Sequence, residues 1–225
     1  MKKNFILLIS LFILSVCLYA KEIEIKYIRE NGKTTTQKFD SEIKTLTLFS
    51  SDSVNFKILD IKGLEQFTNI ENIEIYMLYY EGDYTFLHDI KSPKSLFLDG
   101  ARCSSLKFLE KMTSLKEIEI SFVTSIDETI DLKNLKNIKK ITYQDFYAIR
   151  NEGLEDRKIP NFINVQNKPV LDLNNDHIKK ISKRNIELLK QYSKIILDQN
   201  PICKNKWELR KLKRMNIFIN YINSK

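Results

Sequence analysis

Histidine and cysteine, which often act in catalysis, are few in this chain, and their spacing matches no catalytic or metal-binding motif. Its two histidines, His88 and His177, form no H-E-x-x-H or related metal-binding spacing. The three cysteines include no C-x-x-C pair, and the chain has neither a G-x-S-x-G elbow nor a glycine-rich phosphate loop. The sequence therefore predicts a protein that is not an enzyme and that uses no metal and no cofactor.

A regular apolar pattern predicts the elements that must position any binding residues. It reads Ile70-x-x-Ile73-x-Ile75, and its next copies end at Leu98, Ile120 and Tyr143, after steps of 22 or 23 residues. One copy precedes these four and two follow them, so about seven copies span residues 43–203. A fixed period in the twenties is typical of a repeat protein that presents a long surface.

The repeated phrase resembles the leucine-rich repeat, L-x-x-L-x-L-x-x-N-x-L. Residues 63–70 (GLEQFTNI) and 108–115 (FLEKMTSL) are similar to the approach to the strand in the 22-residue repeats of bacterial internalins. The resemblance implies an α/β leucine-rich repeat solenoid with a parallel concave β-sheet, and non-catalytic protein binding on that concave face.

The ninth position of the repeat departs from the family, which places Asn there. It holds Ser51, Leu78, Ala101, Val123, Phe146, Asp176 and Asn200. Only the last two can bond the backbone of the turn, so we expect apolar packing to replace those bonds in the middle repeats.

The two ends of the chain predict caps. Alternating residues 22–28, an Asn31-Gly32 turn and Thr-rich residues 34–39 predict a β-hairpin at the first edge of the sheet. Residues 206–222 predict a helix that turns Trp207, Leu212, Met215, Phe218 and Ile222 toward the last repeat, which makes Trp207 a capping side chain. The predicted organisation is a signal peptide at 1–20, a hairpin cap at 21–42, the repeats at 43–203 and a helical cap at 204–225.

The segments between the strands are expected to form the convex side. Helical or irregular stretches are predicted at residues 85–91, 106–112, 132–136 and 183–192, and an inserted loop at residues 150–167, where Gly153 and Pro160 break regular structure.

Side chains at the third, fifth and seventh repeat positions should face outward, because strand residues alternate between faces. This register places Phe49, Tyr76 and Phe97 on three adjacent strands, with Glu74 and Glu119 on either side of Phe97. Exposed aromatic anchors beside charges are typical of protein-binding hot spots. A one-residue slip in register would reverse this facing, and Phe49 could instead pack under the hairpin.

The carboxylates Glu74 and Glu119 also allow a hydrolase to be considered. They would lie two strands apart, about 10 Å, a separation that a pair of glycosidase carboxylates nearly reaches. A flat sheet without a pocket disfavours this alternative.

The N-terminus predicts export. Lys2 and Lys3 precede an apolar run, and small Ala20 comes before polar residues, as in a secretory signal peptide. Cleavage after Ala20 is one prediction. The alternative is lipidation of Cys17, because residues 14–17 (LSVC) resemble a bacterial lipobox. Either way the mature protein is secreted, periplasmic or at the cell surface.

The charge is basic but mixed. The chain carries 37 Lys and Arg against 29 Asp and Glu, a net charge of +8, with the excess toward the C-terminus. Interspersed acids favour a solvated face over adhesion to an anionic surface. The basic residues do not alternate with stacking aromatics, so a nucleic-acid partner is not expected.

The two later cysteines predict free thiols. Cys103 and Cys203 follow strands four steps apart, about 19 Å, and a disulfide needs Cα atoms within about 7 Å. We expect both thiols to be mostly buried.

These observations lead to one prediction with one alternative. The protein is expected to be an exported monomer that binds an unidentified protein on its concave face and meets a membrane only through a possible lipid anchor. The alternative is a structural lipoprotein of the envelope, tethered by Cys17, without a specific soluble ligand.

Overall fold

The computed structural model describes residues 22–49, 57–80, 82–102, 104–121, 128–144, 161–174, 178–215 and 217–220. The expected signal peptide at residues 1–20, Cys17 and Cys103 lie outside these ranges. Among the described helices, none is both long and apolar enough to cross a membrane.

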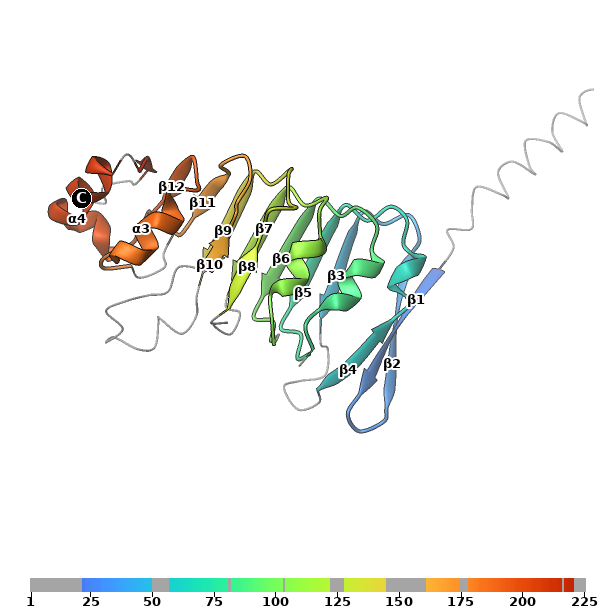
Figure 1. The fold of residues 1–225 in the computed structure, drawn as a ribbon. Helices are drawn as coiled ribbons and strands as arrows, with labels where there is room; N and C mark the ends of the chain where they lie inside the picture. The colour runs from blue at the N-terminus through green and yellow to red at the C-terminus, as the bar shows by residue number, and fades with distance from the viewer. Residues whose placement is uncertain are drawn as a thin grey trace, which may run out of the picture.

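An eight-stranded sheet runs along the molecule (Figure 1). All its neighbouring strands are parallel. In spatial order the strands are β13 (Ile219–Asn220), β12 (Lys194–Ile196), β11 (Val170–Asp172), β9 (Lys140–Gln144), β7 (Glu117–Ser121), β6 (Ser95–Asp99), β5 (Asn72–Tyr76) and β3 (Thr45–Phe49). The fold class is therefore α/β with a large parallel sheet.

The register of this sheet follows the sequence repeat. Leu48, Ile75, Leu98, Ile120 and Tyr143 pair in turn across β3, β5, β6, β7 and β9. All five are buried, because every second side chain of a strand points to the same face. The predicted strand register is confirmed for these copies.

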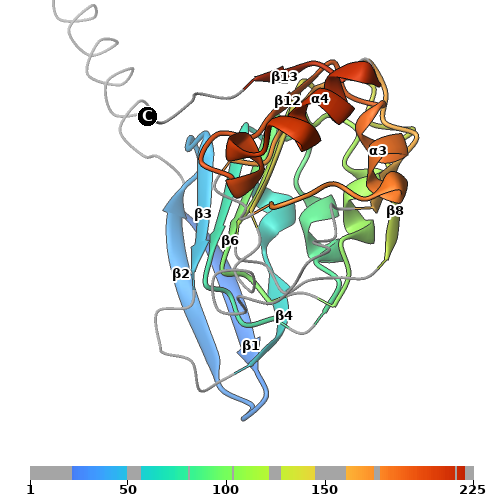
Figure 2. The same ribbon diagram turned by 90° about the vertical axis from the view of Figure 1, so that its left-hand side faces the viewer.

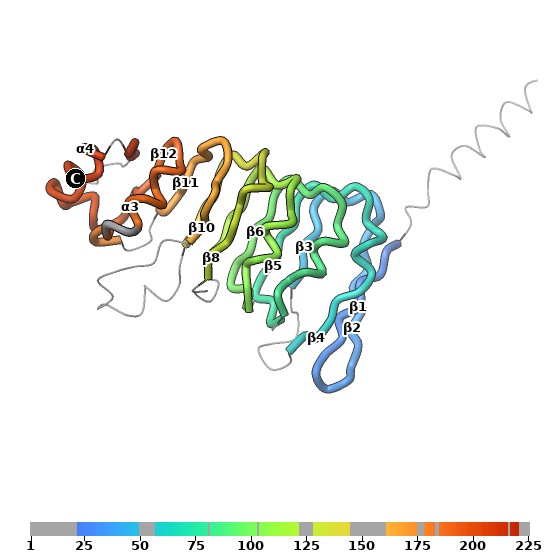
Figure 3. The backbone as a smooth tube through the Cα atoms, viewed as in Figure 1, coloured from blue at the N-terminus to red at the C-terminus, as the bar shows by residue number. Residues whose placement is uncertain are grey.

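A second layer covers the inward face of the sheet (Figure 2). It consists of 3-10 helices at Leu64–Gln66, Thr85–Asp89 and Lys107–Lys111, a two-stranded parallel sheet of β8 (Thr129–Asp131) and β10 (Asn161–Ile163), and helix α3 (Lys183–Leu189). Between the layers, buried aliphatic and aromatic side chains form one continuous core. The tube in Figure 3 passes back and forth between the two layers.

Residues 132–136 form turns, within the helical or irregular structure expected there. The prediction of an inserted loop at residues 150–167 is wrong in part. Residues 150–160 lie outside the described ranges, and residues 161–163 form strand β10, which pairs with β8. Phe162 of β10 is buried beside Ile130 of β8, and the strand pairing supplies partners for the backbone that this burial removes from water.

The predicted hairpin is present, in a sheet of its own. Strands β1 (Glu22–Arg29) and β2 (Thr34–Asp40) pair antiparallel, and β4 (Ile58–Lys62) joins the other side of β1. Gly63, with φ +102°, follows β4 where a Cβ would lie 2.4 Å from the Glu24 carbonyl oxygen. The hairpin lies at the β3 end of the molecule (Figure 1), but it pairs with β4, and among the described strands β3 is hydrogen-bonded only to β5.

The C-terminal helix α4 (Lys206–Arg214) is shorter than expected, because the chain then enters β13. Leu212 is buried and Met215 packs on the core, as predicted. Trp207 is 77% exposed and Phe218 65% exposed, so the predictions that Trp207 is a capping side chain and that Phe218 turns toward the last repeat are wrong. In this turn of the helix Leu209 is buried instead. Trp207 lies two positions earlier and therefore points to nearly the opposite side of the helix, toward solvent. Ile222 lies outside the described residues.

Asn200 bonds the turn backbone as the repeat pattern predicts. It is 2% exposed; its amide donates to the carbonyls of Leu173 (2.6 Å) and Leu197 (3.0 Å), and its Oδ1 accepts from the Ile178 N–H (2.8 Å). Leu78 and Ala101, which occupy the same repeat position, are buried. Apolar packing therefore takes the place of these hydrogen bonds in the described middle repeats.

Cys203 is a free thiol, as expected. It is half-buried, less than predicted, and its Sγ donates to the Leu197 carbonyl at 2.8 Å. Burial raises the pKa of this thiol.

Candidate functional site

Two rows of outward side chains cross the strands at the N-terminal half of the sheet. The first row joins Thr47, Glu74, Phe97, Glu119 and Thr142 in register, and the second joins Phe49, Tyr76, Asp99, Ser121 and Gln144. In-register neighbours in a sheet lie about 4.8 Å apart. The fold therefore brings residues separated by more than 20 positions in the sequence onto one continuous face.

Tyr76 and Phe97 form a ring pair on this face. Their centroids are 5.3 Å apart with the planes inclined at 57°, within the range of favourable aromatic contacts. Both side chains are partly exposed, whereas Phe49, which is in register with Tyr76, is 45% exposed. The three aromatics thus lie on adjacent strands, as the register predicts.

Glu74 is held in place by its neighbours. Its Oε2 accepts a hydrogen bond from Thr47 Oγ1 at 3.2 Å and a longer one from the Tyr76 hydroxyl at 3.5 Å. Burial raises the pKa of the Tyr76 hydroxyl, and the charge of Glu74 adds to that effect. The contact orders the carboxylate and the tyrosine ring beside each other.

Glu119 has a different environment, on the other side of Phe97. Among the described residues it forms no ion pair or hydrogen bond, and the nearby Lys140 pairs with Asp172 at 3.0 Å. Burial raises the pKa of Glu119; Asp172, Asp99 and Glu117 raise it further, while Lys140 opposes them. Glu119 is therefore a partly desolvated carboxylate available to an incoming cation.

These side chains surround a half-open depression of about 300 Å³ in the sheet face, which we call the sheet-face depression. It is lined by Glu74, Tyr76, Ser95, Leu96, Phe97, Glu117, Ile118, Glu119, Lys140 and Thr142. Three carboxylates and one ammonium group give it a negative lining. The expectation of a flat face without a pocket is wrong.

Four of the five predicted binding residues line this depression, and Phe49 lies outside its lining. Glu117, Lys140 and Thr142 were not singled out from the sequence. Cross-strand register could have found them. Thr142 is in register with Glu119, Glu117 lies two positions before Glu119, and Lys140 is in register with Glu117.

Three outward positions are more buried than expected. Ser121, Thr142 and Asp172 are each less than a tenth exposed. The exposed part of the face is therefore concentrated on β3, β5, β6 and the start of β7.

The arrangement suits binding better than hydrolysis. Glu74 and Glu119 stand on either side of Phe97, whose ring occupies the row between them. An inverting pair needs that space for a water molecule, and a retaining pair needs the carboxylates closer together. Among the described residues, no group of three or more His, Cys, Asp or Glu side chains could hold a metal ion.

No protein-family model matches this chain, and a search of curated proteins finds no similar sequence. The functional argument therefore depends on the geometry of the chain itself.

Proposed function

We propose that this protein is a non-catalytic binding module of the leucine-rich repeat type, capped by the N-terminal hairpin and by α4. The parallel pairing of residues 22 or 23 positions apart supports this proposal. The hydrogen bonds of Asn200 support it too, because they satisfy the turn backbone at the position where the repeat pattern has Asn.

The ligand is a protein segment that places a lysine or arginine side chain in the sheet-face depression. The observation that carries this proposal is the position of Glu119, a partly desolvated carboxylate beside the exposed ring pair. A cation is attracted both by a carboxylate and by an aromatic face. Phe49 extends the apolar contact toward the edge at β3.

Peptides that differ in one central residue test the proposal directly. Once a bound segment has been identified by crosslinking in envelope and host extracts, its central Lys or Arg is replaced by uncharged norleucine. Loss of a cation–π contact alone should raise Kd about 2- to 30-fold. Equal affinity for both peptides would contradict the role of the depression.

Variants of the protein supply the matching test. Tyr76→Ala with Phe97→Ala should abolish binding, and Glu119→Gln should weaken it, because each removes a feature that recognises the cation. The control pair Leu59→Ala and Glu187→Gln changes an exposed apolar residue on β4 and an exposed carboxylate on α3. It should bind like the wild type, and unchanged binding by the ring-pair variant would refute the site.

Export is part of the same proposal. The chain either begins at residue 21 after cleavage or is tethered by an acylated Cys17, in which case a structural role in the envelope is the alternative function. The mass of the mature N-terminus separates the two forms.

A further inference from the structure

An aromatic side chain of helix α4 is exposed instead of packing in the core. Trp207 is 77% exposed, and Phe218, which follows the helix, is 65% exposed. The apolar side chains Leu209 and Leu212 of the same helix are buried against the core. Because burying Trp is strongly favourable, the exposure of Trp207 indicates a surface that is covered by something else.

The same side of α4 is uniformly cationic. Lys206, Arg210, Lys213 and Arg214 are all exposed, and at about 100° per residue they fall with Trp207 within about a third of the helix circumference. The acid of this helix, Glu208, lies on the other side and pairs with Lys211 at 3.6 Å. We call the exposed side the cationic face.

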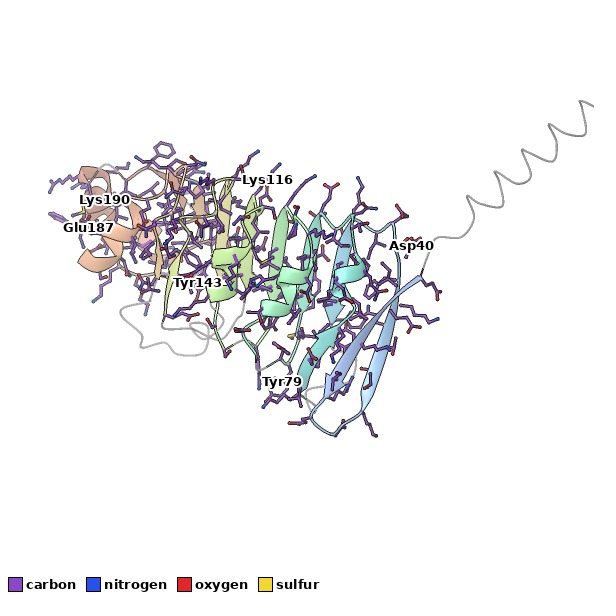
Figure 4. The ribbon with its side chains drawn as sticks, turned by 45° about the vertical axis from the view of Figure 1, so that its right-hand side comes forward. Asp40, Tyr79, Lys116, Tyr143, Glu187 and Lys190 are labelled. Atoms are coloured by element: carbon purple, nitrogen blue, oxygen red, sulfur yellow. The ribbon has the colours of Figure 1, made fainter. Side chains whose placement is uncertain are left out.

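Within the described part of the chain, no acidic side chain forms an ion pair with the cations of this face. The guanidinium carbon of Arg210 lies 6.0 Å from the centroid of the Trp207 ring. Lys206, Lys213 and Arg214 form no ion pair with a described residue. At the end of α3, by contrast, Lys190 pairs with Glu187 at 2.7 Å (Figure 4). The positive charge of α4 is therefore available to an external anion.

We propose that the cationic face docks on an anionic phospholipid surface, with Trp207 entering the headgroup region. Tryptophan prefers the membrane–water interface, and lysine and arginine beside it meet lipid phosphates. Helix α4 lies at the end of the molecule opposite the hairpin (Figures 1 and 3), where a flat surface can approach it. The proposal does not depend on the sheet-face depression, which lies on other strands.

The geometry limits this docking to shallow, reversible contact. The apolar side of α4 is committed to the core through Leu209 and Leu212, so the helix cannot bury an apolar stripe in the bilayer as an amphipathic anchor does. Each basic residue near an anionic surface contributes about fivefold to partitioning. The affinity should therefore be lost at high salt, where such charges are screened.

Tryptophan fluorescence tests the proposal at the site itself, because Trp207 is the only tryptophan of the chain. Adding vesicles of phosphatidylcholine with a third phosphatidylglycerol should shift its emission to the blue and protect it from a soluble quencher. Pure phosphatidylcholine vesicles should produce neither change. The full chain can be used, since lipid contact by another segment leaves Trp207 in water.

Variants complete the test. Lys206→Gln with Lys213→Gln should lower partitioning about 25-fold. The control Lys107→Gln with Lys111→Gln removes the same charge from an exposed 3-10 helix and should retain binding. Three results would overturn the proposal. The Trp207 emission could stay unchanged with anionic vesicles, both double variants could lose partitioning equally, or soluble dextran sulfate could shift the emission as much as the vesicles do.

Discussion

Replacing Asn200 with alanine tests the turn that closes the C-terminal repeats. The side chain is 2% exposed, and three short hydrogen bonds join it to Leu173, Leu197 and Ile178. Asn200→Ala removes all three bonds and leaves two buried carbonyls and one buried N–H without this partner. At about 1 kcal/mol for each lost bond, and more for each group left unsatisfied, the free energy of unfolding should fall by about 3–5 kcal/mol.

Urea denaturation followed by circular dichroism measures this loss. With an m-value of about 3 kcal/mol/M, the midpoint should fall by about 1–1.7 M at constant m. Asn205→Ala is the matched control, because Asn205 caps α4 from an exposed position by accepting from the N–H groups of Trp207 and Glu208. Loss of such a cap costs about 1 kcal/mol. Equal midpoints for the two variants would refute the reasoning from burial.

Two further predictions concern Glu119 and the glycines of the hairpin sheet. Burial raises the pKa of Glu119, so the folded state holds its proton more tightly than the unfolded chain, and ionisation destabilises the fold as the pH rises above about 4. Glu119→Gln should therefore raise the urea midpoint at pH 7, and the gain should fade toward about pH 4; a gain independent of pH would contradict it. Gly63→Ala should lower the free energy of unfolding by about 3 kcal/mol, through backbone strain and the contact with the Glu24 carbonyl. Gly32→Ala should lower it by only about 1 kcal/mol, because Gly32 has φ +76° but open space where its Cβ would lie. Thermal unfolding measures both, and equal costs would show that the close approach at Gly63 is relaxed.

The strand register was predictable because one local rule controls it. Every second strand residue must be apolar to reach the core, so the spacing of Ile75, Leu98 and Ile120 places Tyr76, Phe97 and Glu119 on the outer face. The hairpin was predictable for the same reason, since alternation and an Asn-Gly turn are both local.

The errors arose where local signals are weak. Strand β10 lies in a stretch interrupted by Gly and Pro, and only its partner β8 makes it a strand. Whether Trp207 is buried depends on which side of α4 packs against the core. Apolar character alone favoured burial of Trp207, whereas the structure buries Leu209. The sheet-face depression is lined by residues from four strands, a combination that no single repeat specifies.

The sequence by itself determined the period, the parallel order of the strands and the alternation of core and surface, because these follow from chain geometry over a few residues. The tertiary structure alone decided that Glu119 is partly desolvated and forms no ion pair with a described residue, that Tyr76 contacts Phe97, and that Trp207 shares an exposed face with Lys206, Arg210 and Lys213. Desolvation, ring contact and a free charge depend on what the rest of the chain places nearby, and that becomes definite only when distant segments pack together.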